Sequence, residues 1–166
     1  TLSAGARVDR HAFDVEDKLL TNGDDSGDRN LVQWSPTFGA TYTPSRQFTL
    51  FANLATAYLT PTTVELGNRS DGRGGFNPDL DPEHYRSVEA GVRFIWLGAR
   101  LDGEIAVYQL ELEDMLLPFQ NAGSDEVFYR NASEARNRGA EMHLHWQPRA
   151  SVSMDASLNV IDFVFT

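Results

Sequence analysis

The chain of 166 residues contains no cysteine. It therefore has neither a disulfide framework nor a thiolate metal site, although this absence says little about the cellular compartment. Basic residues are also scarce, because 14 Lys and Arg stand against 24 Asp and Glu, which gives a net charge of −10. Binding to nucleic-acid phosphates needs clustered basic residues, so the composition argues against a nucleic-acid partner.

Long apolar runs are missing as well. No run approaches the roughly 18 residues of a membrane-spanning helix, and no signal-peptide pattern opens the chain. The sequence also shows no Ser/His/Asp or Cys/His arrangement, phosphate-binding loop or isolated carboxylate pair. It therefore predicts no enzyme, no catalytic residue, no metal site and no cofactor.

Alternation of apolar and polar residues is the dominant pattern of the chain. In residues 151–160 the even positions run from Val152 to Val160 and are apolar, whereas the odd positions are polar. Successive side chains of a strand point to opposite faces, so this segment is predicted to be a strand with one apolar face. The same pattern predicts about seven strands and no convincing helix; the others are residues 2–9, 32–42, 47–54, 88–96, 101–113 and 139–146.

Two of these predicted strands are irregular. Pro36 interrupts one of them and removes a backbone donor from its hydrogen-bond ladder. In residues 101–113 the apolar positions change parity between Val107 and Tyr108. Such a change of phase predicts a β-bulge at that point.

The connections between the predicted strands alternate in length. Residues 43–46, 97–99 and 147–149 form tight connections, whereas residues 14–30, 59–84 and 114–136 form long ones. Long loops of this size are unusual in compact soluble domains, but outer-membrane barrels combine short periplasmic turns with long extracellular loops. Single-chain bacterial barrels have an even number of strands, so seven strands are expected to be part of a longer barrel. The sequence predicts an all-β, antiparallel transmembrane β-barrel fragment.

Aromatic residues stand at the ends of the predicted strands, on their apolar face. Aromatic side chains at both rims of an apolar band are typical of membrane interfaces. Strand propensity alone also places aromatics in soluble sheets, but it does not explain their clustering beside the turns. The predicted girdle comprises Tyr42, Phe48, Trp96 and Trp146 near the tight turns, with Trp34 and Tyr58 toward the other end.

Several segments resemble the barrel of TonB-dependent outer-membrane receptors. The resemblance runs from residues 58–66 through residues 76–83 to residues 87–93, with further agreement at 34–44, 129–132 and 138–141. Two prolines hold the second segment extended, which indicates a stiff structural lead into the following strand. The loop motif of the family is formed by Asn77, Pro78, Asp79, Leu80, Pro82 and Glu83.

This resemblance implies a location, a function and partners. Residues 1–166 are expected to be a partial barrel domain that lacks the plug domain and the remaining strands, in the bacterial outer membrane and in contact with its lipid. The complete receptor is expected to import a ferric siderophore or another metal chelate with energy from the TonB complex, which would act through the missing N-terminal part. The alternatives are a passive porin-like channel, which would lack a plug, and a soluble β-sandwich binding module, which would need no detergent.

Arg69 and Arg73 are the candidate ligand-binding residues in the loop of residues 59–84. Many ferric siderophores are anionic, and an Arg side chain offers them a charge and a rigid fork of donors. A solvated polar loop without any ligand is the competing interpretation, because Gly-rich loops of mixed charge are common.

Two further clusters are expected to have no ligand. His143 and His145 share the polar face of one strand, but only Glu141 accompanies them, so they are predicted to be lumen-facing polar residues. Residues 22–28 weakly resemble a calcium-binding loop. Ser35 stands where the bidentate Glu would be, so an acidic surface loop is the better interpretation.

Overall fold

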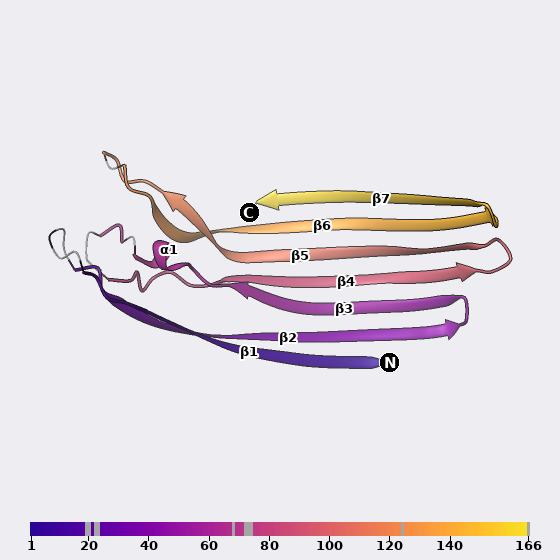
Figure 1. Ribbon diagram of the computed structural model, residues 1–166, viewed down its shortest axis with the longest axis horizontal. Coiled ribbons are helices and arrows are strands. Elements are labelled where there is room, and N and C mark those ends of the chain that lie inside the picture. The colour runs from indigo at the N-terminus through magenta and orange to yellow at the C-terminus, as the bar shows by residue number, and fades with distance from the viewer. Residues whose placement is uncertain (19–20, 22–23, 68, 72–74, 124, 166) are drawn as a thin grey trace.

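The structure is a computed structural model that describes residues 1–18, 21, 24–67, 69–71, 75–123 and 125–165. The chain forms one sheet of seven strands, each antiparallel to its neighbour in sequence order (Figure 1). The strands are β1 (Leu2–Val15), β2 (Gly27–Ser45), β3 (Phe48–Leu59), β4 (Glu83–Trp96), β5 (Leu101–Phe119), β6 (Phe128–Arg149) and β7 (Val152–Phe165). The predicted all-β, antiparallel fold is confirmed.

A short helix, α1 (Thr63–Gly67), lies in the connection between β3 and β4. The sequence did not predict it, because five residues are too few for a periodic pattern to appear. No helix among the described residues is long and apolar enough to cross a membrane.

The two ends of the sheet differ as predicted. The connections of residues 46–47, 97–100 and 150–151 are short and lie together at the right-hand end of Figure 1 (the turn end). The described parts of the connections of residues 16–26, 60–82 and 120–127 lie at the opposite end (the loop end).

The third long connection is much shorter than predicted. β5 and β6 remain paired as far as Phe119 and Phe128, so most of residues 114–136 is a hairpin rather than a loop. The reason is that the alternation that identifies a strand is lost here, because residues 115–119 of β5 are all apolar and residues 130–136 of β6 are mostly polar on both faces.

The two faces of the sheet have different chemistry. On the outer face, directly paired residues of β3 to β7 are all apolar: Leu50, Val92, Ile105, Met142 and Leu158. The adjacent row toward the turn end of β3 belongs to the inner face and is polar throughout: Thr49, Arg93, Glu104, His143 and Ser157.

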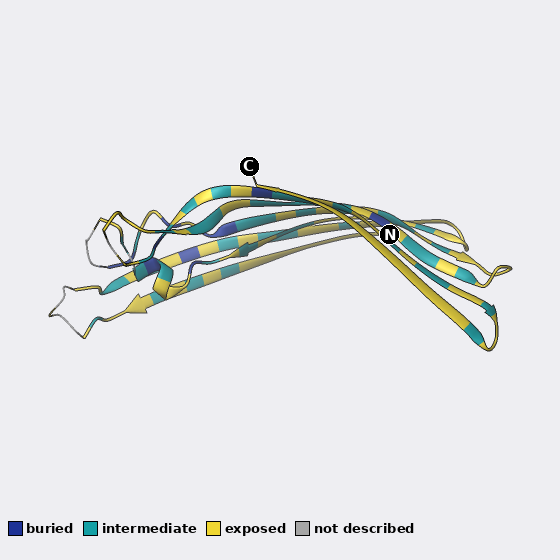
Figure 2. Ribbon diagram, turned by 90° about the horizontal axis from the view of Figure 1, so that it is seen from above, coloured by how far each residue is buried: buried dark blue, intermediate teal, exposed yellow. Residues whose placement is uncertain are grey.

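No second sheet covers the outer face in the described part of the chain, which is a single curved layer (Figure 2). Leu158 is 56% exposed there, and Met154 and Val160 are exposed as well. These are the side chains that a soluble sandwich would bury against a second sheet. The structure therefore does not have the architecture of the β-sandwich alternative.

The apolar band of the outer face is inclined to the rows of paired residues. One row joins Val160 of β7, through Ala140, Val107, Ala90, Ala52 and Ala40, to Leu2 of β1. On β7 the alternating apolar run stops at this row, before Asp162, whereas on β1 it continues past this row toward the loop end as far as Val8. A barrel requires strands that are tilted against its axis, and tilted strands produce such a stagger.

The predicted β-bulge between Val107 and Tyr108 is wrong. The register of β5 against both neighbours is unbroken there, and it shifts only between Leu112 and Leu116. The parity changes because the apolar residues change face: Tyr108 lies on the inner face, directly opposite Gly139 of β6.

Candidate ligand-binding site

The connection between β3 and β4 folds onto the loop end of the sheet. Its helix begins with a capping box, in which the Thr62 N–H donates to Glu65 Oε2 at 2.7 Å and the Glu65 N–H donates to Thr62 Oγ1 at 3.3 Å. Leu66 is fully buried and forms a small core with Phe76 and Leu80. The side chains that pack against this core come from three strands: Phe13, Leu116 and Tyr129.

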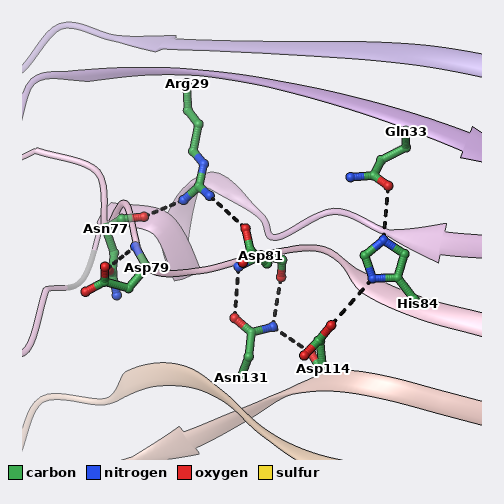
Figure 3. Close-up of polar contacts among 8 residues, drawn as sticks. All are labelled: Arg29, Gln33, Asn77, Asp79, Asp81, His84, Asp114 and Asn131. Carbon is green, nitrogen blue, oxygen red and sulfur yellow. Dashed lines mark hydrogen bonds and ion pairs between the residues drawn. The ribbon is translucent and has the colours of Figure 1, made fainter.

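Two polar residues from distant strands hold the family loop motif (Figure 3). Arg29 of β2 donates to the carbonyl oxygen of Asn77 at 2.6 Å, and its second terminal nitrogen lies 3.4 Å from Asp81 Oδ1. Asn131 of β6 accepts the Asp81 N–H and donates to the Asp81 carbonyl, both at 2.9 Å, and also donates to the Asp114 carbonyl at 2.6 Å.

The contacts of Arg29 and Asn131 with Asn77 and Asp81 form a clamp on the motif, and the motif residues add further contacts of their own. Asn77 Oδ1 accepts the Asp79 N–H at 3.0 Å, which fixes the turn, while Leu80 is in the core and Pro82 is buried. Glu83 is only 8% exposed and accepts the Leu116 N–H at 2.7 Å and the Tyr85 hydroxyl at 2.6 Å. These observations support the structural interpretation of Asn77, Asp79, Leu80, Pro82 and Glu83, whereas Pro78 is exposed.

Beside this clamp, His84 bridges two strands that are not neighbours of each other. Its Nε2 lies 3.1 Å from Gln33 Oε1 of β2, and its Nδ1 lies 3.7 Å from Asp114 Oδ2 of β5 (Figure 3). Sequence analysis missed Arg29, His84 and Asn131, because their partners are about 50 residues away and no local pattern signals them.

Arg69 is committed to contacts within its own loop. Its Nε and Nη2 donate to the two carboxylate oxygens of Asp71 at 3.1 and 2.7 Å, and its Nη1 donates to the Phe76 carbonyl at 3.4 Å. The carboxylate also raises the pKa of the Arg69 guanidinium above its usual value. Arg73, the second candidate, lies outside the described residues.

Tyr58 is placed differently from the other predicted girdle residues. The ladder between β2 and β3 ends at the pair of Thr37 and Ala55, next to Pro36, which has no N–H to continue it. Beyond this break, Tyr58 reaches His11 of β1, with 2.9 Å between its hydroxyl oxygen and His11 Nε2. The two rings meet edge to face with centroids 5.8 Å apart.

A groove of about 470 Å³ surrounds this contact. Arg7, Asp9 and His11 line one side from β1, and Tyr58 and Thr60 line the other. Arg7 Nε donates to Asp9 Oδ1 at 2.8 Å.

The five remaining aromatic residues of the predicted girdle are exposed on the sheet. Trp96 and Trp146 are both paired with Leu101, so all three lie in one row at the turn end. Trp146 Nε1 also donates to the Ala99 carbonyl of the adjacent turn at 3.0 Å. The exposed set is Trp34, Tyr42, Phe48, Trp96 and Trp146.

The inner face near the turn end carries paired charges. His145 Nδ1 lies 2.8 Å from Asp155 Oδ1, Arg93 pairs with Glu104, and the Arg93 guanidinium lies 4.7 Å from the centre of the Phe51 ring. Within the described ranges, no group of three His, Cys, Asp or Glu residues could hold a metal ion.

Residues of the acidic loop after β1 form hydrogen bonds with one another. Asp24 Oδ1 accepts the Ser26 N–H at 3.0 Å, and hydrogen bonds from the Ser26 hydroxyl and backbone lower the pKa of the Asp24 carboxyl. Ser26 Oγ in turn accepts the Asp17 N–H at 2.9 Å. Asn22 and Gly23, which belong to the same predicted loop, lie outside the described residues.

Comparison with known proteins identifies the family. Residues 1–164 match the family described as "TonB dependent receptor-like, beta-barrel", and the chain belongs to it. Receptors of this family are outer-membrane proteins, which places the chain in the bacterial outer membrane.

A known receptor matches almost the whole chain in sequence. The metal-pseudopaline receptor CntO of Pseudomonas aeruginosa (strain UCBPP-PA14) is 25% identical over 161 residues, which are 95% of this chain and 21% of the receptor. The chain therefore spans about a fifth of the length of the curated relatives that it matches.

Solved structures have the same fold. The copper transporter OprC superposes with a TM-score of 0.75 at 21% identity, over 98% of this chain and 26% of OprC. The alcaligin receptor FauA of Bordetella pertussis superposes with a TM-score of 0.68 at 19% identity, over 99% of this chain and 27% of FauA.

Proposed function

We propose that the chain forms seven consecutive strands of a receptor that imports a ferric siderophore or a similar metal chelate across the outer membrane with TonB-derived energy. The observation that carries this proposal is the family match over residues 1–164. The names of CntO, OprC and FauA, which refer to metal–pseudopaline, copper and alcaligin, support a metal or a metal chelate as the substrate.

The shape of the sheet supports a larger barrel. In the described residues, β1 and β7 each pair with one neighbour only, so both edges are open for further strands. The outer face would contact acyl chains, and its aromatic residues would lie at the two interfaces as a girdle. The plug domain and the segment that contacts TonB would belong to other parts of the receptor.

The loop end would face the outside of the cell and would receive the chelate. The loop core around Leu66 and the clamp around Asp81 hold this region in a defined shape, which reduces the ordering cost of binding. Arg69 and Arg73 are the proposed contacts for anionic groups of the chelate.

Metal uptake by living cells tests this function. Cells that produce the complete receptor in a strain without it should accumulate a radiolabelled ferric siderophore, and a protonophore that collapses the inner-membrane gradient should abolish the accumulation. Uptake that a protonophore leaves unchanged would instead indicate passive diffusion through a porin-like channel, which the relatives do not favour.

A further inference from the structure

The groove between β1 and the end of β3 brings together three kinds of metal ligand. Asp9 supplies a carboxylate, His11 supplies an imidazole and Tyr58 supplies a phenol, and all three line the same groove. Asp9 and His11 are two residues apart on one strand and therefore point to the same side. Tyr58 comes from a strand that does not pair with β1, and its hydroxyl already lies 2.9 Å from His11 Nε2.

Arg7 holds the carboxylate of Asp9. Asp9 Oδ1 accepts from Arg7 Nε at 2.8 Å, and Asp9 Oδ2, which is shielded from solvent, lies 2.7 Å from the same nitrogen. An ionised carboxylate has about four lone-pair sites, so these contacts leave it able to bind a metal ion in the groove.

We propose that Asp9, His11 and Tyr58 bind a ferric ion directly, as a metal contact for the imported substrate. The proposal rests on the proposed function, because the ion would be cargo rather than a resident cofactor. Three side chains leave open coordination positions, which a chelating molecule or water would fill.

The set of donor atoms favours iron over other metals. Imidazole nitrogen suits several transition metals, and carboxylate oxygen suits hard cations. Tyrosine oxygen is a known ligand of protein-bound iron. Phenolate and carboxylate oxygens are hard, anionic donors, which suit a small and highly charged cation. The ferric ion fits such a donor set better than Zn²⁺ or Ni²⁺.

The position of the groove suits such a contact. It lies on the inner face beside the loop end, and on the opposite face of the same pair of strands Val8 is paired with Trp34, a residue of the proposed girdle. An ion that enters past the loops would therefore meet this groove at about the depth of the extracellular interface. Arg7 is exposed at its rim and could hold an anionic arm of a chelating molecule.

Visible absorption spectroscopy of the complete receptor in detergent tests the site. Ferric nitrilotriacetate is the probe, because a phenolate bound to ferric iron gives a charge-transfer band at visible wavelengths. We expect this band in the unsubstituted receptor. Tyr58→Phe should abolish it, and His11→Gln should weaken iron binding by at least the roughly tenfold loss that follows removal of an outer-shell partner.

Tyr42→Phe is the matched control, because Tyr42 is also a strand tyrosine but lies exposed on the outer face, where it pairs with Leu50. This variant should keep the full band. An unsubstituted receptor without the band, a band that survives in Tyr58→Phe, or equal losses in both variants would each overturn the site. If siderophore uptake remains energy-dependent while the band is absent, the proposed function stands and only the metal contact fails.

Discussion

Asn131 and Asp81 exchange two hydrogen bonds of 2.9 Å, although 50 residues separate them in the sequence. The side-chain amide of Asn131 satisfies both backbone groups of Asp81, because it accepts from the Asp81 N–H and donates to the Asp81 carbonyl. A third bond, to the Asp114 carbonyl, ties the same amide to β5. One side chain of β6 therefore connects the motif loop to the hairpin beside it.

We predict that Asn131→Asp loosens residues 77–82 without unfolding the barrel. The carboxylate keeps the acceptor for the Asp81 N–H but loses both donated bonds and faces two carbonyl oxygens. The local cost should be about 1–3 kcal/mol. Hydrogen exchange of the complete receptor should show at least a roughly fivefold faster exchange in this loop and little change in β3 and β4.

Asn121→Asp is the control for this substitution. It adds the same charge to a neighbouring connection and removes a longer bond, of 3.3 Å to the Ser70 carbonyl. Exchange of residues 77–82 should remain unchanged in this variant. The same acceleration in both variants would mean that charge, rather than the clamp, controls the loop.

A second prediction concerns the close contact between Tyr108 and Gly139. A Cβ atom built on Gly139 would overlap the ring of Tyr108, so Gly139→Ala forces the ring or the strand to move. Overpacking of this kind costs about 1–3 kcal/mol. The denaturant midpoint of the complete receptor in detergent should fall.

Gly98→Ala provides the comparison, because a Cβ there would have no heavy atom within 4 Å. Its midpoint should match that of the unsubstituted protein. A Gly139→Ala receptor that is equally stable would show that the Tyr108 ring moves away without cost.

The sequence predicted the strands where one face meets lipid and the other meets a polar interior, because this difference enforces alternation. Beyond the apolar band, alternation of apolar and polar residues no longer identifies the strands. Tyr108 was assigned to a bulge although it lies in regular register, and the paired residues near Phe119 and Phe128 were assigned to a loop.

The site was less predictable than the fold. The motif residues near Asp81 were found by resemblance, but their partner Arg29 lies on a strand 52 residues earlier and gives no local signal. Pro36 could have indicated that β3 separates from β2, since a missing N–H ends a ladder. The consequence, that Tyr58 turns toward His11, depends on packing across three strands.

A third prediction concerns Arg69 and Arg73. If both contact an anionic chelate, the double substitution Arg69→Ala with Arg73→Ala should weaken binding of a ferric siderophore by about tenfold or more, because each charge-assisted bond contributes about 1.5–3 kcal/mol. Quenching of tryptophan fluorescence in the complete receptor measures the affinity. Arg46→Ala, in the turn between β2 and β3, should leave it unchanged. Unchanged affinity in the double variant would remove both residues from the site.

The last prediction tests which face contacts lipid. Leu158 and Ser157 are neighbours on β7, but Leu158 pairs with Met142 on the outer face and Ser157 pairs with His143 on the inner face. An Arg on the lipid face near the middle of the bilayer costs about 2–4 kcal/mol, whereas an Arg in a polar lumen costs little. Leu158→Arg should therefore reduce the fraction of the complete receptor that folds into lipid vesicles, measured by its heat-dependent shift in gel mobility, and Ser157→Arg should not. Equal losses at the two positions would contradict the assignment of the faces, because adjacent residues of a strand differ chiefly in the side to which they point.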